Sequence, residues 1–255
     1  MLNVELNGRA PTTEELASLA ATNYGHLTRM QVRGGKVRGM ALHLARLDDG
    51  NEMFFGRRGD VDDELRLRGW IRQALGAVAD ASVRVTVTEL GVLVSVGDPV
   101  PDDPRPPLRV RTDGYERPWP AQKHAATMGL RYARRAAAAV GYDDALFIGR
   151  DGRVREGSMW NVAFWDGAQV VFPDAPMLKG VTMVLLQIAL SMTGNPWTLR
   201  PVRVAELPDL LAAAAINSQC PAQPIGSIGD VVFGEHEKLV SALRTAWDTV
   251  PWDEI

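Results

Sequence analysis

The second half of the chain carries an ordered series of residues whose types suit chemistry on an amine and a phosphate. Lys123 comes first, and Glu156 follows 33 positions later. Gly180–Thr182 then opens an apolar, helix-like run, and Asn217-Ser218 ends the series. A lysine amine near cationic or desolvating groups can act as a nucleophile at neutral pH. Free N–H groups at a helix start bind anions such as phosphate.

Taken singly, each residue has an ordinary structural interpretation. Lys123 alone is a solvated lysine at a helix start, because lysines are rarely buried. Glu156 alone is a polar strand end, and Thr182 after a glycine is a helix cap. Asn217 and Ser218 are common turn residues. Only their joint order and spacing favour a functional site.

Familiar short motifs do not account for the series. The sequence has no Walker loop, no G-x-S-x-G elbow and no G-x-G-x-x-G after a predicted strand. Its four histidines lack the spacing of metal ligands, and Cys220 is the single cysteine. We therefore expect no metal, and we interpret His43 and His124 as structural residues.

The series resembles the class IV aminotransferases, which include branched-chain and D-amino-acid aminotransferases and the related aminodeoxychorismate lyases. Gly152–Asn161 matches their G-x-V-x-E-G-x-x-x-N pattern, and Leu178–Thr182 matches L-x-G-[IV]-T. In the first half, His43–Leu47 is similar to their H-x-x-R-L element. The resemblance covers roughly residues 24–47 and 122–230.

The resemblance implies pyridoxal 5′-phosphate as cofactor, held between two lobes of a fold type IV enzyme and joined to Lys123 as a Schiff base. Glu156 would keep the pyridine nitrogen protonated, so that the ring accepts electrons when a bond at Cα breaks. Lys123 would move the Cα proton of a small amino acid or amine, with a keto acid as the other substrate. The residues implied at the phosphate are Arg46, Val181, Thr182, Asn217 and Ser218.

The chain departs from the family pattern at the substrate side. Where family transaminases read G-D-G-x-[FY]-E-x, Leu27 replaces the aromatic residue and Thr28 replaces the glutamate. Met183 stands where they carry an arginine. Thr28 and Arg29 are the expected substrate contacts. An aminotransferase is the main expectation; an aminodeoxychorismate lyase-like enzyme and a catalytically silent binding relative are the alternatives.

Composition narrows the setting of this chemistry. The 255 residues are 46% hydrophobic and 23% charged, with a net charge of −3, which gives no reason to expect nucleic acid or a membrane surface as partner. The longest apolar stretch, Leu210–Ile216, is too short to span a bilayer. No signal peptide is recognisable, and the single cysteine suits a reducing cytoplasm. The resemblance implies a homodimer.

The elements that must position these residues form a mixed α/β chain with two domains. A proline-rich linker at 99–107 separates a small N-terminal α/β domain, 1–98, from a larger C-terminal domain, 108–255. The resemblance implies that the larger domain is barrel-like and binds the cofactor. Residues 83–87 alternate as a half-buried strand does, with a partner at 92–96. Further strands are expected at 145–148, 161–165 and 168–172. Helices are expected near 67–78, 122–140, 182–192 and 235–247.

Overall fold

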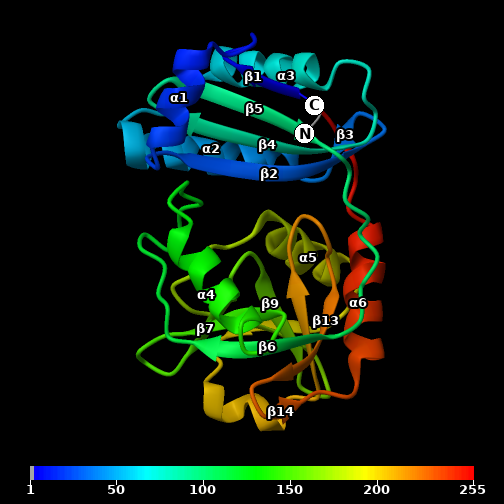
Figure 1. Ribbon diagram of the computed structural model, residues 1–255. Coiled ribbons are helices and arrows are strands. Elements are labelled where there is room, and N and C mark those ends of the chain that lie inside the picture. The colour runs from blue at the N-terminus through cyan, green and yellow to red at the C-terminus, as the bar shows by residue number, and fades with distance from the viewer. Residues whose placement is uncertain (1–2) are drawn as a thin grey trace. The chain divides into compact units, whose positions relative to one another are not determined.

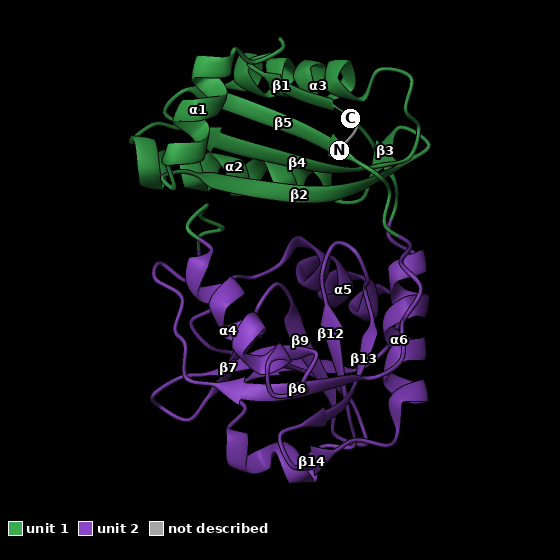
Figure 2. Cartoon of the chain, in the orientation of Figure 1, with its two compact units in different colours: residues 1–100, 122–126, 251–255 green, residues 101–121, 127–250 purple. Residues whose placement is uncertain are grey.

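The computed structural model describes residues 3–255, which divide into two compact units (Figure 2). Unit 1 contains the described residues up to Val100 together with 122–126 and 251–255. Unit 2 contains 101–121 and 127–250. The chain therefore returns to unit 1 twice, first with the segment that carries Lys123 and later with Pro251–Ile255.

Unit 1 is a six-stranded sheet in the order β1-β5-β4-β2-β3-β15 (Figure 1). Its strands are β1 (Asn3–Leu6), β2 (His26–Arg33), β3 (Lys36–Val37), β4 (Ala81–Thr88), β5 (Gly91–Gly97) and β15 (Asp253–Glu254). Its helices are α1 (Thr13–Ala21), α2 (Met40–Phe55) and α3 (Val61–Leu75).

The core of unit 1 lies between one sheet face and the helices α2 and α3. The valines of β4 that alternate in the sequence, Val83, Val85 and Val87, pack with Leu47 of α2 and Ile71 of α3. Successive side chains of a strand leave opposite faces, so residues two positions apart share a face and the three valines are buried together. The strand and helix expected around these residues are confirmed.

The start of α2 is held by a distant part of the chain. Gly39 precedes the helix with φ of 73° and supplies no capping side chain. The carboxylate of Asp253 accepts a hydrogen bond of 2.9 Å from Met40 N, and a negative charge at a helix N-terminus is stabilising. β15 pairs with β3, and Ile255 is buried in the core. The last residues of the chain thus fix the helix that carries His43 and Arg46.

Unit 2 is built on a nine-stranded sheet. Eight strands run in the order β11-β10-β9-β12-β13-β6-β7-β8, and β14 pairs with β13. The strands are β6 (Leu108–Asp113), β7 (Asp144–Ile148), β8 (Val154–Gly157), β9 (Asn161–Trp165), β10 (Val170–Pro173), β11 (Trp197–Arg200), β12 (Ala212–Ile216), β13 (Gln223–Ile228) and β14 (Val231–Val232). The helices are α4 (Met128–Ala138), α5 (Val181–Met192) and α6 (His236–Asp248), with a 3₁₀ turn at Val204–Asp209.

The two edge strands of this sheet, β8 and β11, are joined by hydrogen bonds between the residues at the start of β8 and those that follow β11. Val154 N donates to Val202 O at 2.8 Å, and Val204 N donates to Gly152 O at 3.0 Å. These bonds join the start of β8 to the segment that follows β11. The sheet therefore curls into the barrel-like form expected from the sequence, with α5 and α6 packed on one face.

One predicted helix begins later than expected. Residues 122–140 favour a helix by composition, but α4 begins at Met128 and Lys123 lies in extended chain. Leu27 N donates to Lys123 O at 2.9 Å, and Ala125 N donates to Gly25 O at 2.8 Å. Pairing with the open edge of β2 overrides the helix propensity of the alanines, which is a weak preference.

No helix within residues 3–255 is both long and apolar enough to cross a membrane.

Candidate active site

The candidate lysine lies in unit 1, beside β2. Its backbone is fixed by the two hydrogen bonds to Leu27 and Gly25, and its side chain is half-buried. Lys123 acts electrostatically on the imidazole of His43, as does Arg46. The expected Schiff-base lysine and the expected phosphate-binding arginine therefore both lie close to one buried histidine.

His43 is a buried, neutral histidine bound to Thr28. Thr28 Oγ1 and His43 Nδ1 are 2.6 Å apart, and the two residues are 0% and 3% exposed. Burial, and then the nearby Arg46 and Lys123, lower the pKa of His43 from 6.5 to about 3. The imidazole is consequently uncharged at neutral pH.

The side chains of the two residues expected to contact the substrate point to opposite faces of the sheet. Thr28 and Arg29 are neighbours on β2, so their side chains leave opposite faces of the sheet. Thr28 is turned into the core towards His43, whereas Arg29 is exposed and donates to Ser82 Oγ at 3.1 and 3.2 Å. Partial burial of its guanidinium, on the side that meets Ser82, lowers the pKa of Arg29. Contact of either residue with substrate stays a prediction.

Glu156 lies in unit 2, at the end of β8, in a buried ion pair. Arg117 Nε and Nη2 donate to Glu156 Oε1 and Oε2 at 2.9 and 3.2 Å. The two side chains are 4% and 5% exposed. Leu178 N also donates to Oε1, at 3.4 Å. This is a parallel, two-bond pairing that fixes the plane of the carboxylate.

Asn161, the last residue of the matched β8–β9 pattern, joins that pattern to the start of α5. Its amide nitrogen donates to Leu178 O at 2.7 Å, and its amide oxygen accepts from Gly180 N at 3.0 Å. A Cβ at position 180 would lie 2.3 Å from this oxygen, so only glycine fits there. The asparagine that ends one matched motif and the glycine of the next are thus in direct contact.

The first turn of α5 is suited to an anion. Its N-cap, Gly180, offers no side chain to the helix, and Val181 and Thr182 are buried. The first N–H groups of a helix have no partner within the helix and carry partial positive charge. The Thr182 hydroxyl adds a further donor beside them.

Asn217 and Ser218 follow β12 in a tight loop. Asn217 Oδ1 accepts from Gln219 N at 2.8 Å and from Cys220 N at 3.1 Å, while its amide nitrogen donates to Met159 O at 3.4 Å. Asn217 therefore shapes the loop and joins it to the one after β8. Ser218 is half-buried and makes no hydrogen bond through its hydroxyl within residues 3–255.

Sequence reasoning missed two residues at this site. Arg117 follows β6 in a segment without a recognisable motif, so nothing in the sequence pairs it with Glu156. Tyr115 is affected by both charges, and burial is the main cause that raises its pKa. The contact between Thr28 and His43 was also not predicted. The only hint of it in the sequence is that His43 belongs to the H-x-x-R-L element.

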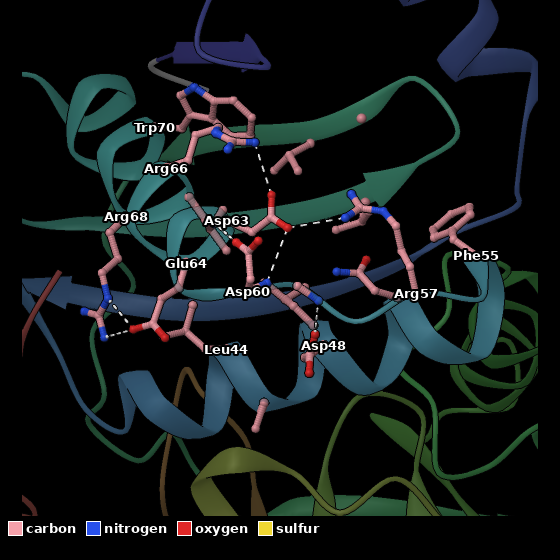
Figure 3. A pocket seen from close by; sticks show the side chains of 18 of the residues that line it. Leu44, Asp48, Phe55, Arg57, Asp60, Asp63, Glu64, Arg66, Arg68 and Trp70 are labelled. Atoms are coloured by element: carbon pink, nitrogen blue, oxygen red, sulfur yellow. Dashed lines mark hydrogen bonds and ion pairs between the residues drawn. The ribbon is translucent and has the colours of Figure 1, made fainter.

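A separate groove of about 790 Å³ lies in unit 1 between α2, α3 and the β4–β5 hairpin (Figure 3). Several of its charged side chains form ion pairs with one another. Asp63 pairs with Arg57 and Arg66 at 3.4 and 3.1 Å, and Glu64 pairs with Arg68 at 2.9 Å. None of the residues expected at the cofactor lines this groove.

Comparison with protein-family models identifies the family of this chain. The model of the family "Amino-transferase class IV" matches residues 25–228, which is most of the chain. The chain belongs to the class IV aminotransferases. No curated protein matches the sequence in the comparison.

Several solved structures are similar to this class IV aminotransferase. A fold IV transaminase from Curtobacterium pusillum is 26% identical, with a TM-score of 0.73 over 88% of this chain and 86% of that one. A hypothetical aminotransferase from Mycobacterium tuberculosis, solved in a pyridoxal-phosphate-bound form, is 19% identical with a TM-score of 0.81 over 97% and 98%. A candidate 4-amino-4-deoxychorismate lyase from Legionella pneumophila is 16% identical, with a TM-score of 0.81 over 95% and 96%.

These comparisons confirm the expected fold type IV architecture and a pyridoxal-phosphate-dependent enzyme. The donor set of this class IV aminotransferase fits that cofactor. A lysine amine suits its aldehyde, and a buried carboxylate suits its ring nitrogen. The first turn of α5, which follows the closely packed Gly180, suits its phosphate. Which residue does which task stays a prediction.

Proposed function

We propose that the chain is a pyridoxal-phosphate-dependent aminotransferase in which Lys123 forms the Schiff base. The observation that carries the proposal is the grouping of Lys123 and Arg46 around the neutral His43. An amine nucleophile beside a guanidinium suits a ligand that carries both an aldehyde and a phosphate.

When bound, the cofactor supplies an electron sink for a bond broken at the substrate's Cα. Lys123 would hold the cofactor through its amine and would carry the Cα proton of the substrate. Glu156 would hold the proton on the pyridine nitrogen. Arg117, through its two hydrogen bonds, would keep the carboxylate of Glu156 in the orientation that this task needs.

Several residues are candidates to hold the phosphate. Val181 and Thr182 would offer backbone N–H groups and a hydroxyl, and Arg46 would offer the cation. Ser218 would add its hydroxyl, which has no other partner within residues 3–255. Asn217 would help to hold the phosphate only by shaping the loop that carries Ser218, because its amide oxygen and its amide nitrogen are both already hydrogen-bonded.

The substrates of the family are amino and keto acids, and we propose a small amino acid or amine for this chain, with Arg29 as the candidate partner of its carboxylate. A lyase that acts on aminodeoxychorismate is the second candidate. Thr28 and the Lys123-His124 pair favour it, because both are closer to the lyases than to the transaminases. We further propose a homodimer, as the resemblance implies, in the reducing cytoplasm that the single cysteine suits.

Trapping the Schiff base tests the proposal directly. The apoprotein is incubated with pyridoxal phosphate, reduced with borohydride and mapped by mass spectrometry. We expect the pyridoxyl group on Lys123 and no labelling in Lys123→Arg, with Lys238→Arg as a matched control. Labelling of Lys179 or Lys238 in place of Lys123 would refute the assignment. A screen of amino donors and aminodeoxychorismate then separates the transaminase from the lyase.

A further inference from the structure

Two ion pairs join the same two segments of unit 2. Arg117 pairs with Glu156, and Arg155 Nη2 donates to Glu116 Oε1 at 3.0 Å. Glu116 and Arg117 are neighbours in the segment after β6, and Arg155 and Glu156 are neighbours in β8. The two pairs are therefore adjacent along both segments, with acid and base exchanged between them.

The outer pair, Glu116 with Arg155, is more exposed than the inner pair, Arg117 with Glu156. Arg155 and Glu116 are 11% and 31% exposed, against 4% and 5% in the inner pair. The Arg155 Nε is buried and has no hydrogen-bond partner within residues 3–255. Ion pairs near the surface are weak, and a buried donor without a partner is costly. The outer pair therefore adds little to the net stability of unit 2.

The order of the charges favours one register between the two segments. If the segment after β6 slipped by one residue, either Glu116 would face Glu156 or Arg117 would face Arg155. Like charges that face each other are destabilising. Two acids on one segment and two bases on the other would instead pair in every register. The observed order thus selects the register in which Arg117 meets Glu156.

The loop before α5 rests on the same two residues of β8. Leu178 N donates to Glu156 Oε1 at 3.4 Å, and Arg155 Nη1 donates to Pro176 O at 3.5 Å. Arg155 and Glu156 therefore face the segment after β6 and this loop together. A slip between the segments would displace the Glu156 carboxylate from both of its donors, Arg117 and Leu178.

We propose that Glu116 and Arg155 are positioning residues whose charges keep Arg117 in register with Glu156. Neither residue would touch the cofactor. They would act through Arg117, which fixes the plane of the Glu156 carboxylate with its two hydrogen bonds. The register concerns unit 2 alone, whereas the consequence for turnover rests on the proposed function, in which Glu156 serves the pyridine nitrogen.

Three substitutions separate charge from shape. Glu116→Gln removes the charge but keeps an amide oxygen, which can still accept the 2.8 Å hydrogen bond that Arg150 N donates to Glu116 Oε1. Arg155→Met removes the charge of the other partner, and Arg155→Lys keeps it. Arg153→Gln is the matched control, because Arg153 precedes β8 and pairs with the exposed Asp151 at 2.5 Å.

Solvent exchange of the Arg117 Nε–H measures the register in the apoprotein. NMR on protein with ¹⁵N-labelled arginine follows this proton, because exchange of a buried donor reports its local opening. We expect Glu116→Gln and Arg155→Met to accelerate the exchange roughly two- to fivefold, the range for losing a partly exposed ion pair. Arg155→Lys should lie closer to wild type than Arg155→Met does, and Arg153→Gln should match wild type. Melting curves confirm that each variant is folded.

Turnover of the holoenzyme tests the consequence for the reaction. A misplaced Glu156 carboxylate weakens stabilisation of the transition state but leaves substrate binding intact. With the best amino donor of the screen, kcat should therefore fall roughly two- to fivefold in Glu116→Gln, with KM unchanged. Arg155→Lys should recover part of the kcat that is lost in Arg155→Met.

The outcomes are distinguishable. A wild-type rate of exchange in Glu116→Gln would overturn the proposal, and so would equal rates in Arg155→Lys and Arg155→Met. A rise in KM in place of the fall in kcat would also overturn it, because the pair would then only stabilise unit 2. If exchange responds as expected but kcat does not, while borohydride labels Lys123, the register stands and the task given to Glu156 is wrong. Labelling of another lysine would refute the proposed function and leave the register intact.

Discussion

Arg117 and Glu156 form a buried two-bond ion pair, with N–O distances of 2.9 and 3.2 Å and side chains 4% and 5% exposed. The pair joins the segment after β6 to the end of β8, 39 residues later. A buried charge that loses its partner is far more costly than a surface charge that does so. The candidate ligand of the pyridine nitrogen is thus also a structural element of unit 2.

Arg117→Met should destabilise the apoprotein strongly. The substitution leaves the Glu156 carboxylate buried without its guanidinium, which costs about 3–5 kcal/mol. The double variant Arg117→Met, Glu156→Gln should recover most of that loss, because neither buried charge remains. Urea unfolding of the two variants and of the wild type measures the difference. Equal stability of the single and double variants would contradict the role of the pair.

Glu156→Gln should separate catalysis from cofactor binding. The amide keeps the size of the side chain but cannot hold the pyridinium proton, so turnover should fall at least about 100-fold. Bound cofactor should fall much less, because the phosphate and Lys123 still hold it. Arg117→Met, Glu156→Gln is the control for stability, since it lacks the unpaired guanidinium of the single variant. Full activity in Glu156→Gln would mean that the carboxylate is only structural.

Arg46→Ala and Thr182→Val should each weaken cofactor binding. Loss of a hydrogen bond to a charged group costs about 1.5–3 kcal/mol, which sets the expected range for Arg46→Ala. Arg58→Ala is the matched control, because Arg58 is exposed and pairs with the surface residues Asp48, Asp49 and Glu52. Cofactor titration and melting of apo and holo protein give the affinities. If all four proteins bind equally, the phosphate site lies elsewhere.

Glycine substitutions at two positions should have opposite effects. In Gly180→Ala the new Cβ would lie 2.3 Å from Asn161 Oδ1, so either the Asn161 side chain, with its two hydrogen bonds, or the loop before α5 must shift, and both stability and cofactor affinity should fall. In Gly69→Ala, within α3, the new Cβ meets nothing within 4 Å. That change should stabilise the apoprotein by about 0.5–1 kcal/mol, because alanine is the better helix former. Thermal unfolding and cofactor titration test both.

His43 should contribute to acid denaturation. Its pKa is about 3 in the folded protein against an ordinary value of 6.5, so between these pH values the unfolded chain binds a proton that the native protein does not. Stability from His43 is therefore complete above about pH 6.5 and is lost as the pH falls towards 3, at about 1.4 kcal/mol per pH unit. The difference in unfolding free energy between wild type and His43→Gln should shrink along that range. A constant difference from pH 7 to pH 4 would show that His43 is not held neutral.

The sequence predicts the fold better than it predicts the detailed site. Alternation in β4 and the pattern from Gly152 to Asn161 indicate their strands, because both features arise from local burial and turn chemistry. The extended backbone at Lys123 could not be foreseen, since it depends on the edge of β2, about 100 residues earlier. Arg117 was missed for the same reason, because its partner is distant and no local spacing marks the pair.

β15 sets the order in which unit 1 can be completed during synthesis. Its carboxylate at Asp253 reaches Met40 N across 213 positions of sequence. At roughly 5–20 residues per second, a ribosome needs on the order of 10–30 s to proceed from Val100 to Asp253. For that interval α2 has no acidic partner at its first turn, and the β3 edge of the sheet lies open. The small unit, although most of its residues precede unit 2 in the sequence, is therefore completed only after unit 2 has been synthesised.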